Sequence, residues 1–392
     1  MNYNFDNLVN RKNTNSLKWD TGHDELPMWV ADMDFLVAKP ISDAIEKRAK
    51  HGIYAYTSIP DKWYDAYINW WNSRHNLSLK KENLLFSNGV MPTISSIIRA
   101  FSDVNDKILI QTPVYHVFFF VIENNDRQVV ENELIYKDDT YYIDYEDLDK
   151  KLKDVKIMLL CNPHNPVGRL WTKDELEKIG QLCKKHGVIL VADEIHCDLV
   201  NPGLEYVPYF SLDKSLTDNA FMCMSPTKTF NIAGLQSSAA YATNSNLFEG
   251  LKKQLLNDQY IMPNVFAIDS VIVAFNECAD WLDNLNEYLY ENKMLVLNFI
   301  EEELPMLKYV TSEATYLLWI DCNEIDCDYE EFYEKLRYQY GLYISPGLQF
   351  GKCGDGFIRM NIACPKSLVL KGLNILKEAI NDINNSNSFC KK

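Results

Sequence analysis

The sequence predicts an α/β fold, in which a large domain has a mostly parallel sheet flanked by helices and a smaller domain is α+β. From about residue 84 to residue 245, short apolar runs alternate with helical patterns, which is typical of βαβ units. The last hundred or so residues differ, because two long helical stretches near 265–304 and 364–384 flank short strands such as 316–320. At 392 residues and 47% hydrophobic, the chain is long enough for two domains.

The clearest βαβ unit runs from an apolar strand at 157–160 to Asp193. A polar loop at 162–168 follows this strand, and a helix is expected at 172–187 because it opens on a capping box and ends at a glycine. The next strand, 188–192, is fully apolar and leads directly into Asp193. Ligands of such sheets collect at the carboxyl ends of the strands, so the loop and Asp193 are expected to border a site.

Charge and cysteine usage exclude several classes of function. The formal net charge is 39 minus 55, or −16, which disfavours nucleic acid and anionic membranes as partners. The ten cysteines lie singly, without a C-x-x-C pair, so neither a disulfide framework nor a zinc cage is expected. The first residues are polar, and the longest apolar run, 114–122, is too short to span a bilayer. We therefore expect a cytoplasmic protein.

Lys228 is the strongest candidate for a reactive group. It follows the apolar strand 220–224 and stands beside the hydroxyls of Ser225 and Thr227. Hydroxyls next to a lysine suit a bound phosphate, and a lysine held at a strand end suits Schiff-base chemistry with a carbonyl. Both together suggest pyridoxal 5'-phosphate (PLP), which has one phosphate and one aldehyde. A surface lysine is the alternative, and it is disfavoured because four other segments complete the same site.

Two of those segments follow strands in the first half of the large domain. Residues 84–88 indicate a strand that turns at Gly89 into a helix with Pro92 in its first turn, where free N–H groups could cradle a phosphate. Tyr115 follows the strand 107–110, and an aromatic there could stack on a flat ring. An ordinary strand–helix turn and a core tyrosine are the respective alternatives.

The other two segments bring charge. Asp193 follows a buried strand and needs a charged partner, which a protonated pyridine nitrogen would supply; a helix N-cap is the alternative. Arg359, on an apolar strand at 357–361, suits bidentate capture of a carboxylate; a structural ion pair is the alternative. We predict no metal, because the candidate ligands match no ligand spacing. These candidates are Cys161, His164, His196 and Cys197.

These segments, in this order, resemble the fold-type I PLP enzymes of the aspartate aminotransferase superfamily, over nearly the whole chain. The resemblance implies that Lys228 carries the cofactor, Asp193 pairs with the pyridine nitrogen and Asn165 bonds the ring 3'-oxygen, while Tyr115 stacks on the ring. It implies that Arg359 binds the substrate α-carboxylate. The implied phosphate ligands are Gly89, Val90, Ser225 and Thr227.

Tyr56 matches a tyrosine that reaches the phosphate of a neighbouring subunit, so the resemblance implies a homodimer with shared sites. We predict Lys228, Asp193, Tyr115 and Tyr56 as the catalytic residues. The sequence pattern predicts three regions, of which the first is too irregular to stand alone and is expected to pack on the last. They are an N-terminal arm at 1–45, a large PLP-binding domain at 46–285 and a small α+β domain at 286–392.

Two departures from ordinary aminotransferases narrow the resemblance. Gln236 stands where an arginine usually binds phosphate, which weakens the expected phosphate binding, and His196 replaces a common tyrosine and is expected near the cofactor. With the segments 27–35 and 193–198, these changes are similar to the MalY/PatB group of cystathionine β-lyases and related C–S lyases. The stretch at 201–205 departs from the more basic sequence expected there.

The resemblance implies PLP-dependent β-elimination from L-cystathionine and related cysteine S-conjugates, with an amino acid as the small-molecule substrate. The backbone of Trp29, Val30 and Ala31, together with Asn165, is expected to help bind it. An aminotransferase with the same cofactor apparatus is the alternative. A role in contacting another protein is a weaker alternative, because no surface stripe in the sequence supports it.

Overall fold

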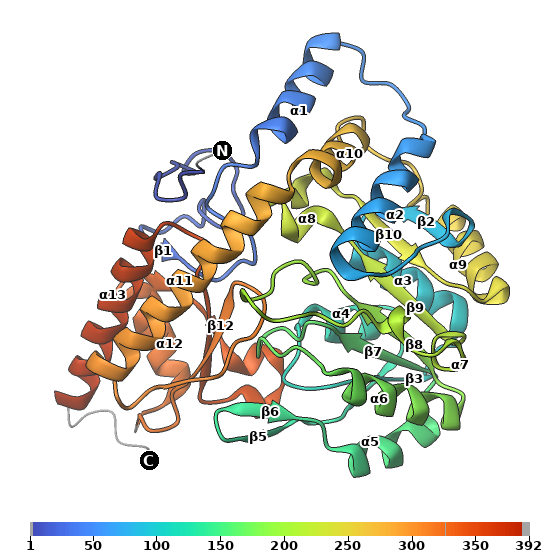
Figure 1. Ribbon diagram of the computed structural model, residues 1–392. Coiled ribbons are helices and arrows are strands. Elements are labelled where there is room, and N and C mark those ends of the chain that lie inside the picture. The colour runs from blue at the N-terminus through green and yellow to red at the C-terminus, as the bar shows by residue number, and fades with distance from the viewer. Residues whose placement is uncertain (1–2, 326, 386–392) are drawn as a thin grey trace.

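The computed structural model describes residues 3–325 and 327–385. It shows two bodies that share the long helix α11, which crosses from one to the other (Figure 1). The larger body contains a seven-stranded sheet, and the smaller contains a four-stranded antiparallel sheet. The predicted α/β class is therefore confirmed. Cys390 lies outside the described residues.

The seven-stranded sheet has the order β2-β10-β9-β8-β7-β3-β4. Strand β10 runs antiparallel to both of its neighbours, and the other pairs are parallel. The strands are β2 (Leu84–Ser87), β3 (Lys107–Ile110), β4 (Gln128–Glu131), β7 (Ile157–Cys161), β8 (Ile189–Asp193), β9 (Ala220–Met224) and β10 (Ser238–Tyr241).

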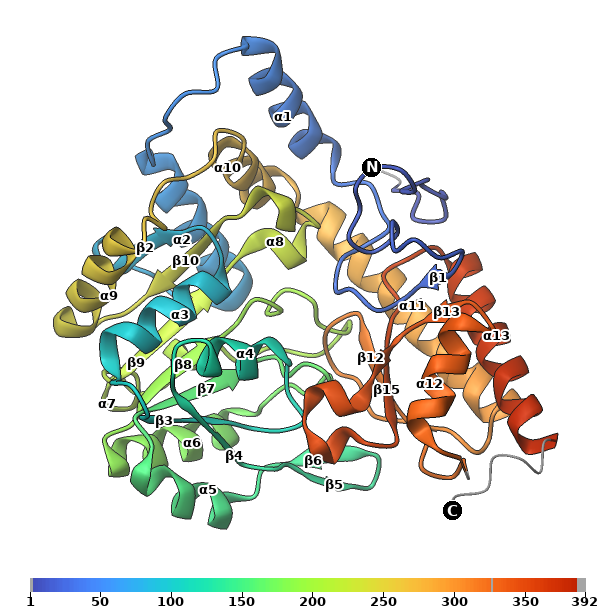
Figure 2. The same cartoon turned by 180° about the vertical axis from the view of Figure 1, so that it is seen from behind.

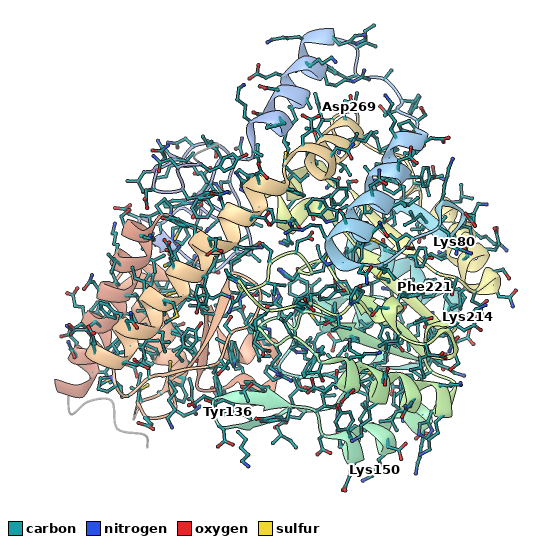
Figure 3. All side chains as sticks on the ribbon, in the orientation of Figure 1. Lys80, Tyr136, Lys150, Lys214, Phe221 and Asp269 are labelled. Carbon is teal, nitrogen blue, oxygen red and sulfur yellow. The ribbon has the colours of Figure 1, made fainter. Side chains whose placement is uncertain are left out.

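The central strands are apolar throughout because both of their faces are covered. Alternate side chains of β9 belong to two different hydrophobic clusters, with Met222 in one and Phe221 in the other. In Figure 3, Phe221 lies within the large body while exposed Lys150 and Lys214 lie at its edge. The helices whose residues join the Phe221 cluster are α3 (Val90–Phe101), α4 (Val117–Glu123) and α9 (Ser245–Asn257).

Helix α6 (Lys173–His186) packs on the opposite face through the predicted stripe of Leu176, Ile179 and Cys183. The capping box predicted at Thr172 is present, and Gly187 ends the helix in a left-handed conformation. The remaining helices of the large body are α2 (Asp61–His75), α5 (Tyr145–Lys151), α7 (Lys214–Thr217), α8 (Pro226–Thr229) and α10 (Ala267–Glu277). Helix α1 (Lys39–His51) projects from the molecule (Figure 1).

The smaller body contains the sheet β11-β12-β15-β14. Its strands are β11 (Lys308–Tyr309), β12 (Leu317–Asp321), β14 (Ser345–Pro346) and β15 (Phe357–Asn361), and its helices are α11 (Ala279–Glu303), α12 (Tyr329–Tyr338) and α13 (Lys366–Asn385). The predicted helix at 265–304 is wrong in one respect, because the chain breaks at Cys278 into α10 and α11.

The N-terminal arm is tied to the smaller body by main-chain pairing. Strand β1 (Leu26–Pro27) runs parallel to β13 (Leu342–Tyr343), and Figure 2 shows both beside α11 and α13. A separate hairpin joins β5 (Ile135–Lys137) to β6 (Thr140–Tyr142). None of the helices in the described residues is both long enough and apolar enough to span a membrane. The domain limits given above stay a prediction.

Candidate active site

The carboxyl ends of three neighbouring strands meet at one level of the large sheet. Asp193 at the end of β8 stands opposite Cys161 on β7 and Cys223 on β9. The loop that carries Asn165 therefore starts beside Asp193, and Ser225 follows on the other side. This register brings together side chains that the sequence placed after separate strands.

Asp193 is a buried carboxylate with few partners of its own. Its Oδ1 accepts the N–H of Ile195 at 3.2 Å, as a turn-capping aspartate does. Burial raises its pKa to about 7, opposed by that N–H and by the charge of Lys228. Since a buried carboxylate is stable when paired with a cation, the position suits a protonated ring nitrogen.

Lys228 lies on α8, one turn of helix capped by the hydroxyl of Ser225, where the sequence predicted a loop. Its Nζ donates a hydrogen bond to the carbonyl of Ala31 at 2.5 Å, and the side chain is only partly buried. Burial lowers the pKa of its amine to about 8; the charges of Asp32 and Asp193 act against this lowering and that of Arg359 adds to it. An amine with this pKa is partly uncharged at neutral pH and can act as a nucleophile or a base.

The predicted phosphate ligands come together through β10. Ser238 pairs with Ser87 on β2, and their hydroxyls are 2.7 Å apart. One residue earlier, the carbonyl of Ser237 accepts the hydroxyl of Ser225 at 2.6 Å, and this hydroxyl lies 2.7 Å from that of Thr227. Strand β10 therefore ties the turn after β2 to the start of α8.

The turn after β2 ends at Gly89, the residue before α3. The first bond within this helix is from Thr93 N–H to the carbonyl of Gly89, so the N–H groups of Val90 and Met91 lie ahead of it. A Cβ at Gly89 would stand only 3.2 Å from a ring carbon of Pro92. Gln236 stands where the superfamily usually has an arginine. Its side chain is exposed, and its backbone has a left-handed conformation with φ 51°.

Arg359 is buried on β15 and bonds neutral acceptors. Its Nη2 donates to the carbonyl of Trp29 at 2.7 Å and to the hydroxyl of Ser345 at 3.3 Å, and its Nη1 donates to Asn165 Oδ1 at 3.3 Å. Burial lowers the pKa of the guanidinium to about 10. Because its hydrogen bonds within the described residues go to neutral atoms, its charge is left for a ligand carboxylate, and a structural ion pair is disfavoured.

Two rings face this charged centre. Burial raises the pKa of the Tyr115 hydroxyl to about 12. The positive charge of Arg359 opposes this increase, and the negative charge of Asp193 adds to it. His196 packs edge-on against Tyr316 with ring centroids 6.1 Å apart, and burial lowers its pKa to about 3, with the charges of Lys228 and Arg359 adding to the effect. His196 is therefore a neutral imidazole within reach of the charge of Lys228.

Tyr56 does not join the site of its own chain. Its side chain is 95% exposed, in the segment 52–60 between α1 and α2. A tyrosine this exposed can serve only a site that another molecule brings to it.

The four residues weighed as metal ligands do not converge. His164 Nε2 lies 2.8 Å from the carbonyl of Pro113, and His196 faces Tyr316. Within the described residues, the group whose ligand atoms lie within 4.8 Å of one another is a different one: His75, Cys197 and Asp198. Hydrogen bonds account for it, because the Asp198 carboxylate accepts from three donors. These donors are Trp70 Nε1 at 3.1 Å, His75 Nε2 at 2.9 Å and Thr229 Oγ1 at 2.9 Å.

Sequence reasoning missed two residues that border the site. Tyr316 donates its hydroxyl to the carbonyl of Ala31 at 3.0 Å, and the negative charge of Asp32 opposes the lowering of the Lys228 pKa more strongly than that of Asp193 does. Tyr316 lies in the predicted strand 316–320, and Asp32 lies in the segment 27–35 that is similar to the MalY/PatB group, but neither pattern indicates a contact with the site. Residues 29–35 form one wall of the site, and we call this segment the strap.

The chain belongs to the aminotransferase class I and II family, whose profile matches residues 15–375. It is 38% identical over 385 residues to cystathionine beta-lyase PatB of Bacillus subtilis (strain 168), covering 96% of this chain and 100% of the relative.

Solved structures agree with this membership. Cystalysin from Treponema denticola, which contains PLP, superposes with a TM-score of 0.94 at 33% identity, covering 98% of this chain and 100% of cystalysin. A PLP-bound protein from Clostridium difficile 630, whose name places it provisionally among the aminotransferases, superposes with a TM-score of 0.95 at 41% identity, covering 97% of this chain and 100% of that one.

The chemistry of this site fits PLP, and PLP is the cofactor of the chain. A buried carboxylate with no ion-pair partner among the described residues, an amine of lowered pKa and a hydroxyl-lined turn suit its ring nitrogen, aldehyde and phosphate respectively.

Proposed function

We propose that this protein is a PLP-dependent C–S lyase that cleaves L-cystathionine and related cysteine S-conjugates to a thiol, pyruvate and ammonia. The carrying observation is that the Lys228 amine and the Arg359 guanidinium bond neighbouring carbonyls of one strap, in a chain 38% identical to a cystathionine β-lyase. A carboxylate held by Arg359 would place the α-carbon of an amino acid near Lys228. For cystathionine the thiol is homocysteine.

When bound, PLP supplies an aldehyde that joins an amino group and a ring that accepts the electrons of the broken Cα–H bond. Lys228 would hold the aldehyde, and Asp193 would keep the ring nitrogen protonated. Asn165 would bond the ring 3'-oxygen, and Tyr115 would cover one ring face. The hydroxyls of Ser225 and Thr227 would hold the phosphate, with the N–H groups at Gly89 and Val90.

Lys228 would then move the proton. Its amine, with a pKa of about 8, is the group in the pocket suited to remove the Cα proton once it is free. Arg359 would fix the carboxylate so that the bonds to be broken stand across the ring, which is an orientation effect. Trp29, Val30 and Ala31 would line the carboxylate and thiol side of the pocket. His196, neutral and buried, would pack beside the cofactor without adding charge.

A substrate test separates this proposal from its alternative, an aminotransferase. The protein, incubated with L-cystathionine and no 2-oxo acid, is expected to release pyruvate, ammonia and a free thiol in equal amounts. Amino transfer that requires an added 2-oxo acid, with no thiol released, would contradict the lyase. Borohydride reduction followed by peptide mapping tests Lys228 itself, and a label on any other residue would refute that role.

We also propose a homodimer in which Tyr56 completes the phosphate site of the partner subunit. The support is the 95% exposed tyrosine in a segment whose Ile53 and Tyr54 are also exposed, at 61% and 58%. Tyr56→Phe is expected to weaken PLP retention by about tenfold, the value of one hydrogen bond. Tyr54→Phe, whose hydroxyl bonds Ala49 within its own chain, is the matched control. A mass of 45.5 kDa in solution would contradict the dimer.

Cytoplasmic location is likewise a proposal. Leaving Cys327 aside, eight cysteines of the described residues are free thiols, seven of them buried, as is usual in a reducing compartment. Retention of activity in a reducing buffer, with loss after export to an oxidising compartment, would support it.

A further inference from the structure

The strap presents its backbone carbonyls to the cationic groups of the site. Lys228 and Tyr316 both donate to the carbonyl of Ala31, at 2.5 and 3.0 Å, and Arg359 donates to that of Trp29 at 2.7 Å. The direction of these carbonyls therefore sets where the amine and the guanidinium lie.

The N-terminal arm holds the strap through two carboxylates. Arg11 forms a fork on Asp32, with Nη2–Oδ2 at 2.7 Å and Nη1–Oδ1 at 3.1 Å, and its Nη1 also lies 2.7 Å from Asp34 Oδ1. Lys18, which is 1% exposed, lies 2.7 Å from Asp34 Oδ2 and 3.4 Å from Asp32 Oδ1. Trp19 Nε1 donates to Asp34 at 2.7 Å. Two cations therefore balance two carboxylates.

The two carboxylates differ in what else they face. The Asp34 side chain is 4% exposed and is engaged by Arg11, Lys18 and Trp19. The Asp32 side chain is 23% exposed, and its charge acts on both Lys228 and Tyr316, raising the pKa of each. Asp32 therefore stands at the junction between the arm and the site, whereas Asp34 serves the arm.

We propose that Asp32 is a positioning residue for the lyase reaction: clamped by Arg11, it fixes the Ala31 carbonyl against the Lys228 amine and holds a negative charge beside it. The inference rests on the proposed role of Lys228. It gives the amine, whenever it is free, a fixed acceptor and a neighbouring countercharge. Among the described residues, the other charged or titratable groups near Lys228 are Asp193 on β8, Arg359 on β15 and His196 after β8, together with the Tyr316 hydroxyl that shares the Ala31 carbonyl.

The test is a pH titration of the visible absorbance of bound PLP, which reports protonation of the nitrogen that Lys228 provides. Asp32→Asn removes a negative charge, so the midpoint is expected to fall by on the order of one pH unit. Arg11→Met removes the nearer of the two cations that pair with Asp32, leaving Lys18 at 3.4 Å, so the midpoint is expected to rise. Asp34→Asn, the matched control, is expected to lower the melting temperature with little change in the midpoint.

A merely structural role predicts a different pattern. Loosening the strap would move the Asp32→Asn and Arg11→Met midpoints in the same direction, or would make Asp34→Asn behave like Asp32→Asn, and either result overturns the proposal. Asp32→Glu, which keeps the charge, is expected to bring the midpoint most of the way back to the wild-type value, and it also serves if Asp32→Asn folds poorly.

A second measurement does not need bound cofactor at the start. The rate at which cofactor-free protein captures PLP depends on the uncharged amine of Lys228. In Asp32→Asn the pH profile of this rate is therefore expected to move to lower pH, as the midpoint of the absorbance titration does. If borohydride labels a residue other than Lys228, the proposed role of Lys228 fails and the role of Asp32 fails with it. If it labels Lys228 but the midpoints of the three variants coincide with the wild type, only the role of Asp32 fails.

Discussion

Two regions of this molecule each contain a lysine whose pKa is lowered by burial, and they differ in what surrounds that lysine. Lys228, on α8, has a pKa of about 8, and Lys293, in the middle of α11, has a pKa of about 7. Lys293 is the more deeply buried, at 3% exposed, whereas Lys228 is partly open. Depth of burial therefore points to the wrong lysine.

The surroundings distinguish the two. Lys293 donates to Asn201 Oδ1 at 2.6 Å and to the carbonyl of Ala314 at 3.3 Å, and the same two segments are joined by a bond from Asn201 N–H to the carbonyl of Glu313. It holds two loops together. Around Lys228, by contrast, several charged and aromatic groups from separate elements converge. A perturbed amine indicates a reactive site only when such groups accompany it.

The largest expected difference is in catalysis. Lys228→Ala is expected to lower kcat/KM by about 10³-fold or more, because it would remove both the proposed attachment point of the cofactor and the proposed base. Lys293→Met is expected to keep kcat/KM within about threefold, since Lys293 touches no part of the site. Pyruvate release from L-cystathionine measures both. Comparable losses in the two variants would break the distinction between the regions.

Asp193→Asn is expected to lower kcat by on the order of 10²-fold, because an amide does not stabilise a protonated ring nitrogen as a carboxylate does. The bound cofactor should show altered absorbance in the same variant. Glu194→Gln, next to it and also buried, bonds Tyr209 and Asn162 and is the matched control for folding. Wild-type turnover in Asp193→Asn would show that this carboxylate does not act on the cofactor.

Asp193 also gives the cofactor-free protein a pH signature. Its carboxyl has a pKa of about 7 in the folded chain against 3.8 ordinarily, so the folded state binds more protons between these values. The free energy of unfolding therefore falls as pH rises from about 4 to about 7. Asp193→Asn removes this pH-dependent loss of stability. The free energy of unfolding of the cofactor-free variant is therefore expected to exceed that of the wild type by about 1–3 kcal/mol above pH 7, and by less at pH 5. Urea denaturation at both pH values measures this, and an equal gain at both would contradict it.

Arg359→Lys is expected to raise the KM for cystathionine by about tenfold, because a single ammonium would replace the guanidinium proposed to form a fork on the substrate carboxylate. Arg127→Lys is the control: Arg127 also bonds backbone carbonyls, those of Asn125 and Ser102, but lies beside β4 away from the strap. A fall in kcat with an unchanged KM would assign Arg359 to a different step.

The smallest effect concerns Lys293 and stability. Its pKa of about 7 lies below the ordinary 10.5, so between these values the unfolded chain binds a proton that the folded chain does not, and stability rises with pH. Burying the charged ammonium costs stability, and this cost is fully present below pH 7. Lys293→Met removes the cost but also loses the two hydrogen bonds that Lys293 donates. The stability of the variant relative to the wild type is therefore expected to decline by about 1 kcal/mol or more from pH 6.5 to pH 9. A pH-independent difference in melting temperature would contradict it.

Much of the fold was accessible from the sequence because it depends on local pattern. Strands β7, β8 and β9 were predicted because each is a short apolar run, and the capping box at Thr172 predicted the start of α6. The break at Cys278 was missed because no glycine or proline marks it. The one-turn helix that carries Lys228 was missed for a related reason, since four residues are too few to show a period.

The sequence by itself determined which polar residues follow strands, and so which of them could meet at one edge of the sheet. The parallel order of the strands makes that edge common to all of them. Only the tertiary structure decided that the strap closes the site, since Ala31 and Lys228 are 197 positions apart. No local pattern links such distant segments: the contact depends on packing between the arm, the smaller sheet and α8, which is a property of the whole fold.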